Sequence, residues 1–433
     1  MVVEPVEVSG AVERRGREMR DVATGASTAP GTLAGHVGAT ETIEVRTGGP
    51  AGGPGRVTPI WGVVVDGRVY VRSSHGAVGR WYERARRRGE LSVVTPGGDL
   101  SAQVVPVTDD ATLDAVDSAY RRKYDDWPQY LPALVAAPAR GNTLELVPAP
   151  DAAASGTFLL GGDLEVRRLG YGTMQLTGPG VWGPPEDRDQ AVAVLRRAVE
   201  LGVTLIDTAD SYGPDVAEEL VREALAPYPA DLVIATKVGF ARPGPGRWAV
   251  DGRPERLRER AEGSLRRLGV ERIDLLQLHR VDPRYPLEDQ LGVLGDLQRE
   301  GKVRHVGLSE VGVGTLEAAL GAVRVVSVQN RYNLGDREAE DVLRFAEARG
   351  LAFVPWFPLG TGGLTARSGA LGRVADALGA EPAQVALAWL LQRSPVMLPI
   401  PGTSSVTHLE SNLGSASLEL DEEALDALDA AAG

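Results

Sequence analysis

The sequence predicts an α/β protein in which residues 157–433 fold into a (β/α)8 barrel and residues 37–148 form a small, mainly β, α+β domain. Three observations support this prediction. Apolar strand segments alternate with amphipathic helical segments through the C-terminal part, whose length is close to the roughly 250 residues of such barrels. The upstream part has short alternating strands separated by turn residues. The stretch VPAPDAAASG, rich in Pro, Ala and Gly, separates the two patterns, and residues 149–156 are taken as a linker.

The first domain is expected to be a small β-barrel with two helices, preceded by a disordered segment, residues 1–36. Alternating apolar residues in TPIWGVVVDGRVYVRSS predict two strands joined at Asp66-Gly67, a dipeptide typical of type I′ hairpins. LSVVTPGGDLSAQVVPV repeats this pattern around Gly97-Gly98. The stretches VGRWYERARRRG and DDATLDAVDSAYRRKY predict helices that pack against the sheet.

Eight strands are predicted for the barrel, and in chain order they are RLGYGTMQ, VTLIDTAD, LVIATKV, IDLLQLH, VRHVGLSE, VVSVQN, LAFVPWF and MLPIPGT. The helical pattern between them is clear in PERLRERAEGSLRRLG, where Leu257, Ala261 and Leu265 recur every four residues. The hairpin-like FLLGGDLEVRRL before the first strand is expected to plug the N-terminal end of the barrel. A doubly wound sheet is the competing fold, but it requires GxGxxG after the first strand, and RLGYGTMQLTGPG lacks that spacing.

The composition excludes several classes of function. A net charge of −13 argues against general binding to nucleic acid or anionic membranes. The chain has no cysteine, and its five histidines lack metal-binding spacing, so we expect neither disulfides nor a metal site. No apolar run approaches the roughly 18 residues of a membrane span, and the N-terminus lacks the apolar core of a secretory signal. The expected location is the cytoplasm.

Four residues at strand ends carry the predicted chemistry, because the functional loops of such a barrel follow the strand C-termini. Asp207 and Tyr212 follow the second strand, Lys237 ends the third and His279 ends the fourth. Reducing a carbonyl requires a proton donor at its oxygen, and a tyrosine with a pKa of about 10 is a weak acid. A lysine ammonium would lower that pKa, an aspartate would keep the lysine charged, and a histidine would donate a second hydrogen bond.

Each of these residues also has a simpler interpretation. Asp207 alone is more readily a cap of the following turn, Tyr212 a core or rim aromatic, and His279 a core histidine. Lys237 is harder to explain in this way, because ATKVG is otherwise apolar and only three of the 46 basic residues are lysines. The coincidence of all four at the correct strand ends favours catalysis.

The segments IDTADSYG, ATKVG, LLQLHR and IPGTSSVTHLESNL resemble motifs of the aldo-keto reductase family across the whole barrel. The resemblance implies an enzyme that reduces a small-molecule aldehyde or ketone, with Tyr212 as general acid, Lys237 and Asp207 tuning it, and His279 orienting the carbonyl. It also implies an NADP(H) cofactor bound without a Rossmann fold. Trp356 would stack on the nicotinamide, and Ser309 with Gln329 would hold its carboxamide. The remaining implied cofactor contacts are Gly172, Thr173, Glu310 and Phe357, the backbone of Leu359 and Gly360 at the pyrophosphate, and Gly402, Thr403, Ser404, Ser405, His408 and Asn412 at the adenosine end.

The sequence departs from the family pattern in three places. Glu310 follows Ser309 where an asparagine is usual, which replaces an amide with a carboxylate beside the expected carboxamide contact. The loop after the seventh strand reads PWFPLG where Tyr-Ser-Pro-Leu is common. Ser404, Ser405 and His408 occupy the 2′-phosphate region where many members carry lysine and arginine. NADPH remains the expected cofactor, because hydroxyls and a histidine also bind phosphate.

RLGYGTMQLTGPGVWGPPEDRDQAV and PLGTGGL resemble the pyridoxal reductase (pyridoxine 4-dehydrogenase) branch of the family, which implies reduction of pyridoxal to pyridoxine. Trp182 and Trp248 would then line an aromatic pocket, or else pack as ordinary loop tryptophans. A regulatory protein that binds NADPH without turnover is the alternative to an enzyme. The first domain resembles an uncharacterised family related to flavin-binding split β-barrels, so a flavin is considered there. Its Arg72, Ser73 and Ser74 would grip a phosphate or, more simply, form a solvated turn.

Overall fold

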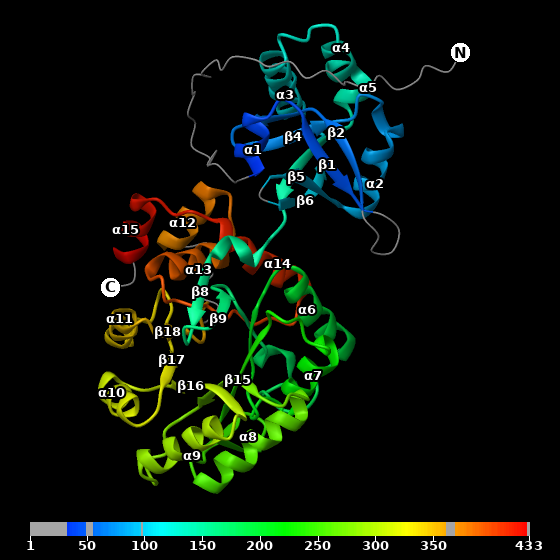
Figure 1. Cartoon of the computed structure of the whole chain (residues 1–433). Coiled ribbons are helices and arrows are strands. Elements are labelled where there is room, and N and C mark those ends of the chain that lie inside the picture. Colours follow the sequence, from blue (N-terminus) through cyan, green and yellow to red (C-terminus); the bar gives the residue numbers. More distant parts are fainter. Residues whose placement is uncertain (1–32, 49–54, 97, 361–368, 431–433) are drawn as a thin grey trace. The chain divides into compact units, whose positions relative to one another are not determined.

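The computed structural model describes residues 33–48, 55–96, 98–360 and 369–430. They divide between two compact units, Met1–Ala149 and Pro150–Gly433 (Figure 1). We call them unit 1 and unit 2 and describe each by itself.

Unit 1 is built on a seven-stranded antiparallel sheet in the order β2-β1-β5-β6-β7-β4-β3. Its strands are β1 (Ile43–Thr47), β2 (Arg56–Ile60), β3 (Gly62–Val65), β4 (Arg68–Arg72), β5 (Glu90–Thr95), β6 (Gly98–Pro106) and β7 (Thr143–Pro148). Its helices are α1 (Leu33–Ala39), α2 (Arg80–Arg88), α3 (Asp110–Lys123), α4 (Leu131–Val135) and α5 (Ala137–Arg140).

The two predicted hairpins and two predicted helices of unit 1 are present. Between β3 and β4, Asp66 and Gly67 have φ angles of 48° and 74°, as a type I′ turn requires. Strands β5 and β6 pair directly across their turn, whose Gly97 lies outside the described residues. Helix α2 buries Trp81, Tyr82 and Ala85 in one apolar cluster of the sheet, and α3 contributes Leu113, Val116, Ala119 and Tyr120 to another.

Two expectations for unit 1 are corrected. The segment expected to be disordered ended at residue 36, but residues 33–36 belong to α1, with Leu33 and Ala34 buried; residues 1–32 lie outside the described residues. Arg72 neither grips a phosphate nor lies in a solvated turn. It is 2% exposed, pairs with Asp117, and donates to the Thr143 hydroxyl at 2.8 Å. Arg72 therefore holds the sheet and α3 together from inside.

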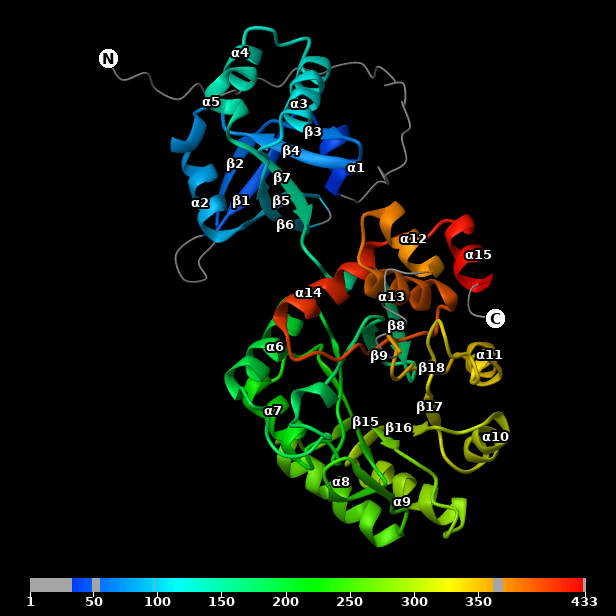
Figure 2. The ribbon, with the colours of Figure 1, turned by 180° about the vertical axis from the view of Figure 1, so that it is seen from behind.

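Unit 2 is the predicted barrel (Figures 1 and 2). Its parallel strands follow the order β10-β11-β12-β15-β16-β17-β18. These strands are β10 (Tyr171–Gly172), β11 (Leu205–Asp207), β12 (Val233–Val238), β15 (Ile273–Leu278), β16 (Val303–Ser309), β17 (Val325–Gln329) and β18 (Ala352–Phe353). The helices around them are α6 (Arg188–Glu200), α7 (Val216–Leu225), α8 (Pro254–Leu268), α9 (Leu287–Arg299), α10 (Val313–Ala322), α11 (Glu340–Arg349), α12 (Gly369–Leu378), α13 (Pro382–Arg393), α14 (Val406–Gly414) and α15 (Glu422–Ala430).

The eighth predicted strand, MLPIPGT, is not a regular strand, and it closes the ring as a short extended segment. On one side Phe353 N donates to the Val396 carbonyl at 2.9 Å, and Leu398 N donates to the Phe353 carbonyl at 2.8 Å. On the other side Gly170 N donates to the Pro399 carbonyl at 2.9 Å. Pro399 and Pro401 have no N–H to donate, which explains why pairing stops after so few bonds.

The hairpin of β8 (Thr157–Leu160) and β9 (Leu164–Arg167) plugs the N-terminal end of the barrel, as predicted. Its Leu160 and Val166 are buried in one apolar cluster with strand residues such as Leu205, Val233 and Leu275. Asp163 at the hairpin turn lies 2.5 Å from Nε2 of His305 at the start of β16. The plug is thus held by apolar packing inside the barrel and by a polar contact at its turn.

The predicted linker, residues 149–156, is partly folded. Ala152–Ser155 form a 3-10 helix in which Ala152 is fully buried. Ala152 N donates to the Leu201 carbonyl at 2.9 Å, and Leu169 N donates to the Ser155 hydroxyl at 3.0 Å. These bonds attach the segment to unit 2.

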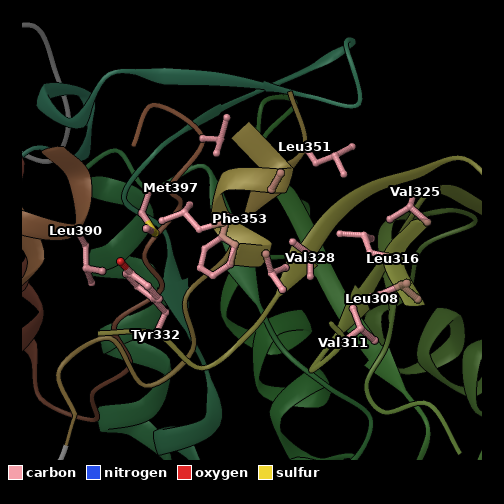
Figure 3. Packing of buried hydrophobic residues seen from close by; sticks show 14 of the residues in the cluster. Leu308, Val311, Leu316, Val325, Val328, Tyr332, Leu351, Phe353, Leu390 and Met397 are labelled. Carbon is pink, nitrogen blue, oxygen red and sulfur yellow. The ribbon is translucent and has the colours of Figure 1, made fainter. Parts of the chain in front are cut away.

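The largest apolar cluster of unit 2 lies between the strands and their covering helices (Figure 3). Leu308, Val328 and Phe353 come from three successive strands, and Leu316 of α10 and Leu390 of α13 belong to the same cluster. This outer packing fixes the strands whose C-terminal ends carry the site. No helix among the described residues is long and apolar enough to cross a membrane.

Candidate active site

A cavity of about 470 Å³ opens where the barrel strands end. Of the predicted catalytic residues it exposes Asp207, Tyr212 and His279, while Lys237 lies behind them. The described residues that line it are Gly172, Thr173, Met174, Gln175, Val181, Asp207, Tyr212, Phe240, Trp248, His279, Arg280, Ser309, Gln329, Trp356, Phe357, Pro358, Leu359, Gly360, Ile400, Pro401 and Gly402.

Lys237 joins Asp207 to Tyr212. Its Nζ lies 2.5 Å from Asp207 Oδ1 and 3.4 Å from the Tyr212 hydroxyl, and it donates to the Thr208 carbonyl at 2.9 Å. Lys237 is fully buried, Asp207 is 2% exposed and Tyr212 is 7% exposed. The ammonium therefore has three fixed acceptors and one orientation.

Two glutamines hold the other oxygen of Asp207. Gln329 Nε2 donates to Asp207 Oδ2 at 2.9 Å, and Gln277 Nε2 donates to the same oxygen at 3.2 Å. Gln329 was expected to hold a carboxamide, and its amide nitrogen is here bonded to Asp207 while the side chain still lines the cavity. Gln277 was missed, although its position two residues before His279 at a strand end was a usable signal.

The pKa shifts in this group partly differ from the expectation. Burial lowers the pKa of Lys237, but Asp207 and Tyr212 raise it more, so the net pKa lies above its ordinary value and the ammonium is stable. Burial raises the pKa of Tyr212, and the opposing effect of Lys237 is smaller. Lys237 thus favours the phenolate as predicted, but the net pKa of the phenol is raised and not lowered. Tyr212 is a protonated phenol at neutral pH.

His279 is a neutral imidazole. Burial, followed by the charges of Lys237, Arg280 and Arg242, lowers its pKa well below 6.5. Its Nδ1 lies 3.4 Å from the Ser211 hydroxyl. If that hydroxyl donates, the ring proton resides on Nε2, where it is available to a carbonyl oxygen.

An aromatic wall flanks this group and comes from an element that the sequence did not predict. A hairpin, β13 (Phe240–Gly244) with β14 (Arg247–Val250), directly follows β12. Phe240 lies 4.7 Å from the His279 ring, and Trp248 lies 5.2 Å from Phe240 and 6.4 Å from Tyr212, by ring centroids. Trp248 lines the cavity as expected; Trp182 does not.

Arg242 fixes this wall. Its guanidinium carbon lies 3.6 Å from the centre of the Trp248 ring. Its nitrogens donate to the Ser211 carbonyl at 2.6 Å and to the Gly180 carbonyl at 2.8 Å. The hairpin is thereby tied to the loops that carry Tyr212 and Val181.

Arg280, which sequence reasoning also missed, lines the cavity beside His279. Its guanidinium donates to the His279 carbonyl at 2.6 Å and to the Ser309 hydroxyl at 3.1 Å. It lies 5.4 Å from the Phe240 ring and 6.0 Å from the Trp356 ring. The motif LLQLHR placed this arginine directly after a predicted site residue, and that was the signal available.

Glu310 has a different position from the one expected. Its side chain does not line the cavity; its Oε1 accepts hydrogen bonds from Trp356 Nε1 at 2.6 Å and from Arg331 N at 2.7 Å. Its φ of 56° is in the left-handed region that asparagine enters more readily. The carboxylate therefore anchors the indole of Trp356, which does line the cavity.

The structure brings together only part of the predicted cofactor set. The members that line the cavity are Gly172, Thr173, Ser309, Gln329, Trp356, Phe357, Leu359, Gly360 and Gly402. Those outside its lining, apart from Glu310, are Thr403, Ser404, Ser405, His408 and Asn412, around the start of α14. Ser405 caps that helix by accepting from His408 N at 3.4 Å, and Asn412 is 6% exposed on its later turn.

The comparisons with known proteins divide the chain in the same way as its fold. Residues 168–432 match the model of the aldo/keto reductase family. Residues 34–146 match a family of uncharacterised proteins conserved in bacteria (DUF2255). The second match does not support the flavin considered for unit 1, and we propose none.

Two curated relatives resemble the barrel closely. An uncharacterised oxidoreductase of Schizosaccharomyces pombe is 49% identical over 281 residues, which cover 65% of this chain and 91% of that protein. Pyridoxine 4-dehydrogenase of Escherichia coli is 46% identical over 282 residues, which cover 64% of this chain and 98% of that protein.

Solved structures agree with these matches. A glycerol dehydrogenase from Gluconobacter oxydans has a TM-score of 0.59 at 28% identity, over 64% of this chain and 95% of that chain. An aldo-keto reductase from Klebsiella pneumoniae, solved in complex with NADPH, has a TM-score of 0.54 at 29% identity, over 63% of this chain and 94% of that chain. The family match, the close relatives and the shared fold together establish that the chain belongs to the aldo/keto reductase family.

Proposed function

We propose that the protein reduces an aromatic aldehyde to the corresponding alcohol with NADPH, and that pyridoxal, which becomes pyridoxine, is such a substrate. The observation that carries the proposal is the buried Asp207–Lys237–Tyr212 group, whose phenol faces a cavity with an aromatic wall. The 46% identical pyridoxine 4-dehydrogenase and the neighbour solved with NADPH support the substrate and the cofactor.

The residues present fit a nicotinamide cofactor. The hydroxyl of Thr173 is buried without a hydrogen-bond partner and belongs to the cavity lining. A Cβ on Gly402 would lie 2.6 Å from the Gly172 carbonyl oxygen, and one on Gly172 would lie 2.7 Å from the Ile400 carbonyl oxygen. Only glycine permits this close backbone approach. Trp356 and Ser309 would hold the nicotinamide end, and the start of α14, with Ser404, Ser405 and His408, would hold the phosphate of the adenosine end.

In the proposed reaction bound NADPH would supply the hydride for the carbonyl carbon, and the residues of the chain would provide the rest. Tyr212 gives its hydroxyl proton to the carbonyl oxygen, so that one C–H and one O–H bond form and the carbonyl π bond breaks. Lys237 stabilises the phenolate that remains, and Asp207 keeps Lys237 charged and in place. Neutral His279 donates a hydrogen bond to the same oxygen. Solvent then returns a proton to Tyr212.

Tyr212→Phe tests this role. We expect turnover of pyridoxal and of benzaldehyde to fall by about 10²–10⁴-fold, the usual contribution of a general acid. NADPH binding should be retained, because the phenyl ring still fills its place. The measurements are the loss of NADPH absorbance for turnover and fluorescence titration for binding.

Two results would contradict the proposal. Unchanged activity of the Tyr212→Phe variant would remove Tyr212 from the mechanism. Tight NADPH binding by the unaltered protein, with no turnover of any aldehyde in a panel, would favour a regulatory protein that uses the barrel as a sensor.

A further inference from the structure

The ionisable groups that line the cavity leave one uncompensated charge. Asp207 is neutralised by Lys237, whose Nζ is 2.5 Å away. Tyr212 and His279 are both neutral, since burial raises the pKa of the phenol and lowers that of the imidazole. Among the described lining residues only Arg280 is left, and a guanidinium keeps its proton in proteins. The described part of the lining therefore carries one net positive charge.

No carboxylate of the described residues forms an ion pair with Arg280. Its Nη1 donates to two neutral oxygens, the His279 carbonyl and the Ser309 hydroxyl. Glu310 is the acidic residue that influences its pKa, but that carboxylate already accepts from Trp356 and from the Arg331 amide. A half-buried guanidinium between two aromatic rings is expected to gain from an anion that shares its low-dielectric surroundings.

We propose that Arg280 binds an oxyanion carried by the substrate on the carbon next to the aldehyde, so that the preferred substrates are ortho-hydroxy aromatic aldehydes bound as phenolates. This inference rests on the proposed function and narrows it to a substrate class. His279 and Arg280 are consecutive residues that both border Phe240. We therefore orient the aromatic aldehyde in this proposal with its carbonyl oxygen at His279 and Tyr212 and its ortho oxygen on the Arg280 side. Pyridoxal, with a ring hydroxyl beside its aldehyde, belongs to this class.

The experiment compares 2-hydroxybenzaldehyde with 2-methoxybenzaldehyde, which has the same ring but no ionisable oxygen. We expect the ratio of their kcat/KM values to favour the hydroxy compound by about tenfold or more once its phenol is ionised, in the range of a hydrogen bond to a charged group. In Arg280→Met the ratio should fall about tenfold, and Arg280→Lys should restore part of it. Arg299→Met is the matched control, because this exposed arginine on α9 pairs, among the described residues, only with Asp296 of its own helix. Its ratio should equal that of the unaltered protein.

A binding measurement separates this inference from the proposed function. 4-Deoxypyridoxine has the ionisable ring hydroxyl but no aldehyde, and its binding to the full chain is measured by calorimetry. We expect it to bind about tenfold more weakly to Arg280→Met than to the unaltered protein or to Arg299→Met. If no aldehyde is reduced but this difference is found, the proposed function fails and the oxyanion site stands.

Two outcomes would overturn the inference. In the first, both aldehydes are reduced and Arg280→Met changes neither their ratio nor the binding of 4-deoxypyridoxine; the reductase assignment then survives. In the second, Arg280→Met weakens NADPH binding about tenfold with the ratio unchanged, which would assign Arg280 to the cofactor.

Discussion

Two opposing effects govern the protonation of Tyr212, the proposed general acid. Burial favours the neutral phenol, and the Lys237 ammonium, 3.4 Å away, favours the phenolate. The sequence led to the ammonium through the scarcity of lysine, but it gave no measure of burial. Seven per cent exposure of Tyr212 is a property of the assembled loops, so the direction of the net pKa shift was not predictable from the motif.

The pH dependence follows from these directions. In the proposed reaction the phenol of Tyr212 must be protonated, and its pKa is raised above 10. The imidazole of His279 must be neutral, and its pKa is lowered well below 6.5. We therefore expect kcat/KM for benzaldehyde, which does not ionise, to be flat between about pH 7 and pH 9. Steady-state rates across this range are the measurement. An activity that falls by pH 8 would mean that Lys237 outweighs burial after all.

Glu310 provides a second prediction at this scale. Glu310→Ala removes the acceptor for Trp356 Nε1, so the indole loses its anchor at the cavity. We expect NADPH to bind about fivefold more weakly, which corresponds to a hydrogen bond of roughly 1 kcal/mol. Glu310→Gln, which keeps an acceptor oxygen, should bind NADPH almost normally. Equal affinities of both variants and the unaltered protein, by fluorescence titration, would exclude this role.

Among the elements, those with a long periodic pattern were predictable and those made by tertiary contacts were not. Helix α8 follows from its leucine spacing and the type I′ turn of unit 1 from Asp66-Gly67. Hairpin β13–β14 has strands of five and four residues, too short to produce a pattern, and Arg242 stabilises it through contacts far along the chain. The eighth segment was apolar enough to suggest a strand, but its prolines limit its backbone pairing.

Hairpin β13–β14 should determine the preference for aromatic substrates. Trp248→Ala removes the ring that forms the outer part of the wall. We expect KM for benzaldehyde to rise about three- to tenfold, which corresponds to the binding free energy of one aromatic contact. KM for propanal, which has no ring to stack, should change little. Trp248→Phe is the matched control and should retain most of the affinity. An equal rise in KM for both aldehydes would indicate a general collapse of the site.

For the whole molecule, the matches to curated relatives predict that unit 2 is catalytically active without unit 1. The pyridoxine 4-dehydrogenase relative is covered over 98% of its length by 64% of this chain. We expect residues 150–433 alone to fold and to reduce the same aldehydes. Residues 157–433 lack the 3-10 helix Ala152–Ser155 and its bonds to Leu201 and Leu169, and should melt about 5 °C lower, for a loss of roughly 2 kcal/mol. Thermal melts of the two fragments are the measurement, and equal melting temperatures would show that the segment is a true linker.

The arginine-rich composition has a consequence if the protein reduces aldehydes, as proposed. Aldehydes condense with free amines and add to thiols, and this chain has no cysteine and only three lysines. Lys237 is fully buried, and Lys302 is paired with Glu262 and Glu300. Lys123, whose pKa burial lowers to about 8, donates to the carbonyls of Val37 and Gly62. Each lysine amine is therefore engaged, and the side chains offer the substrate few places for damaging covalent attachment.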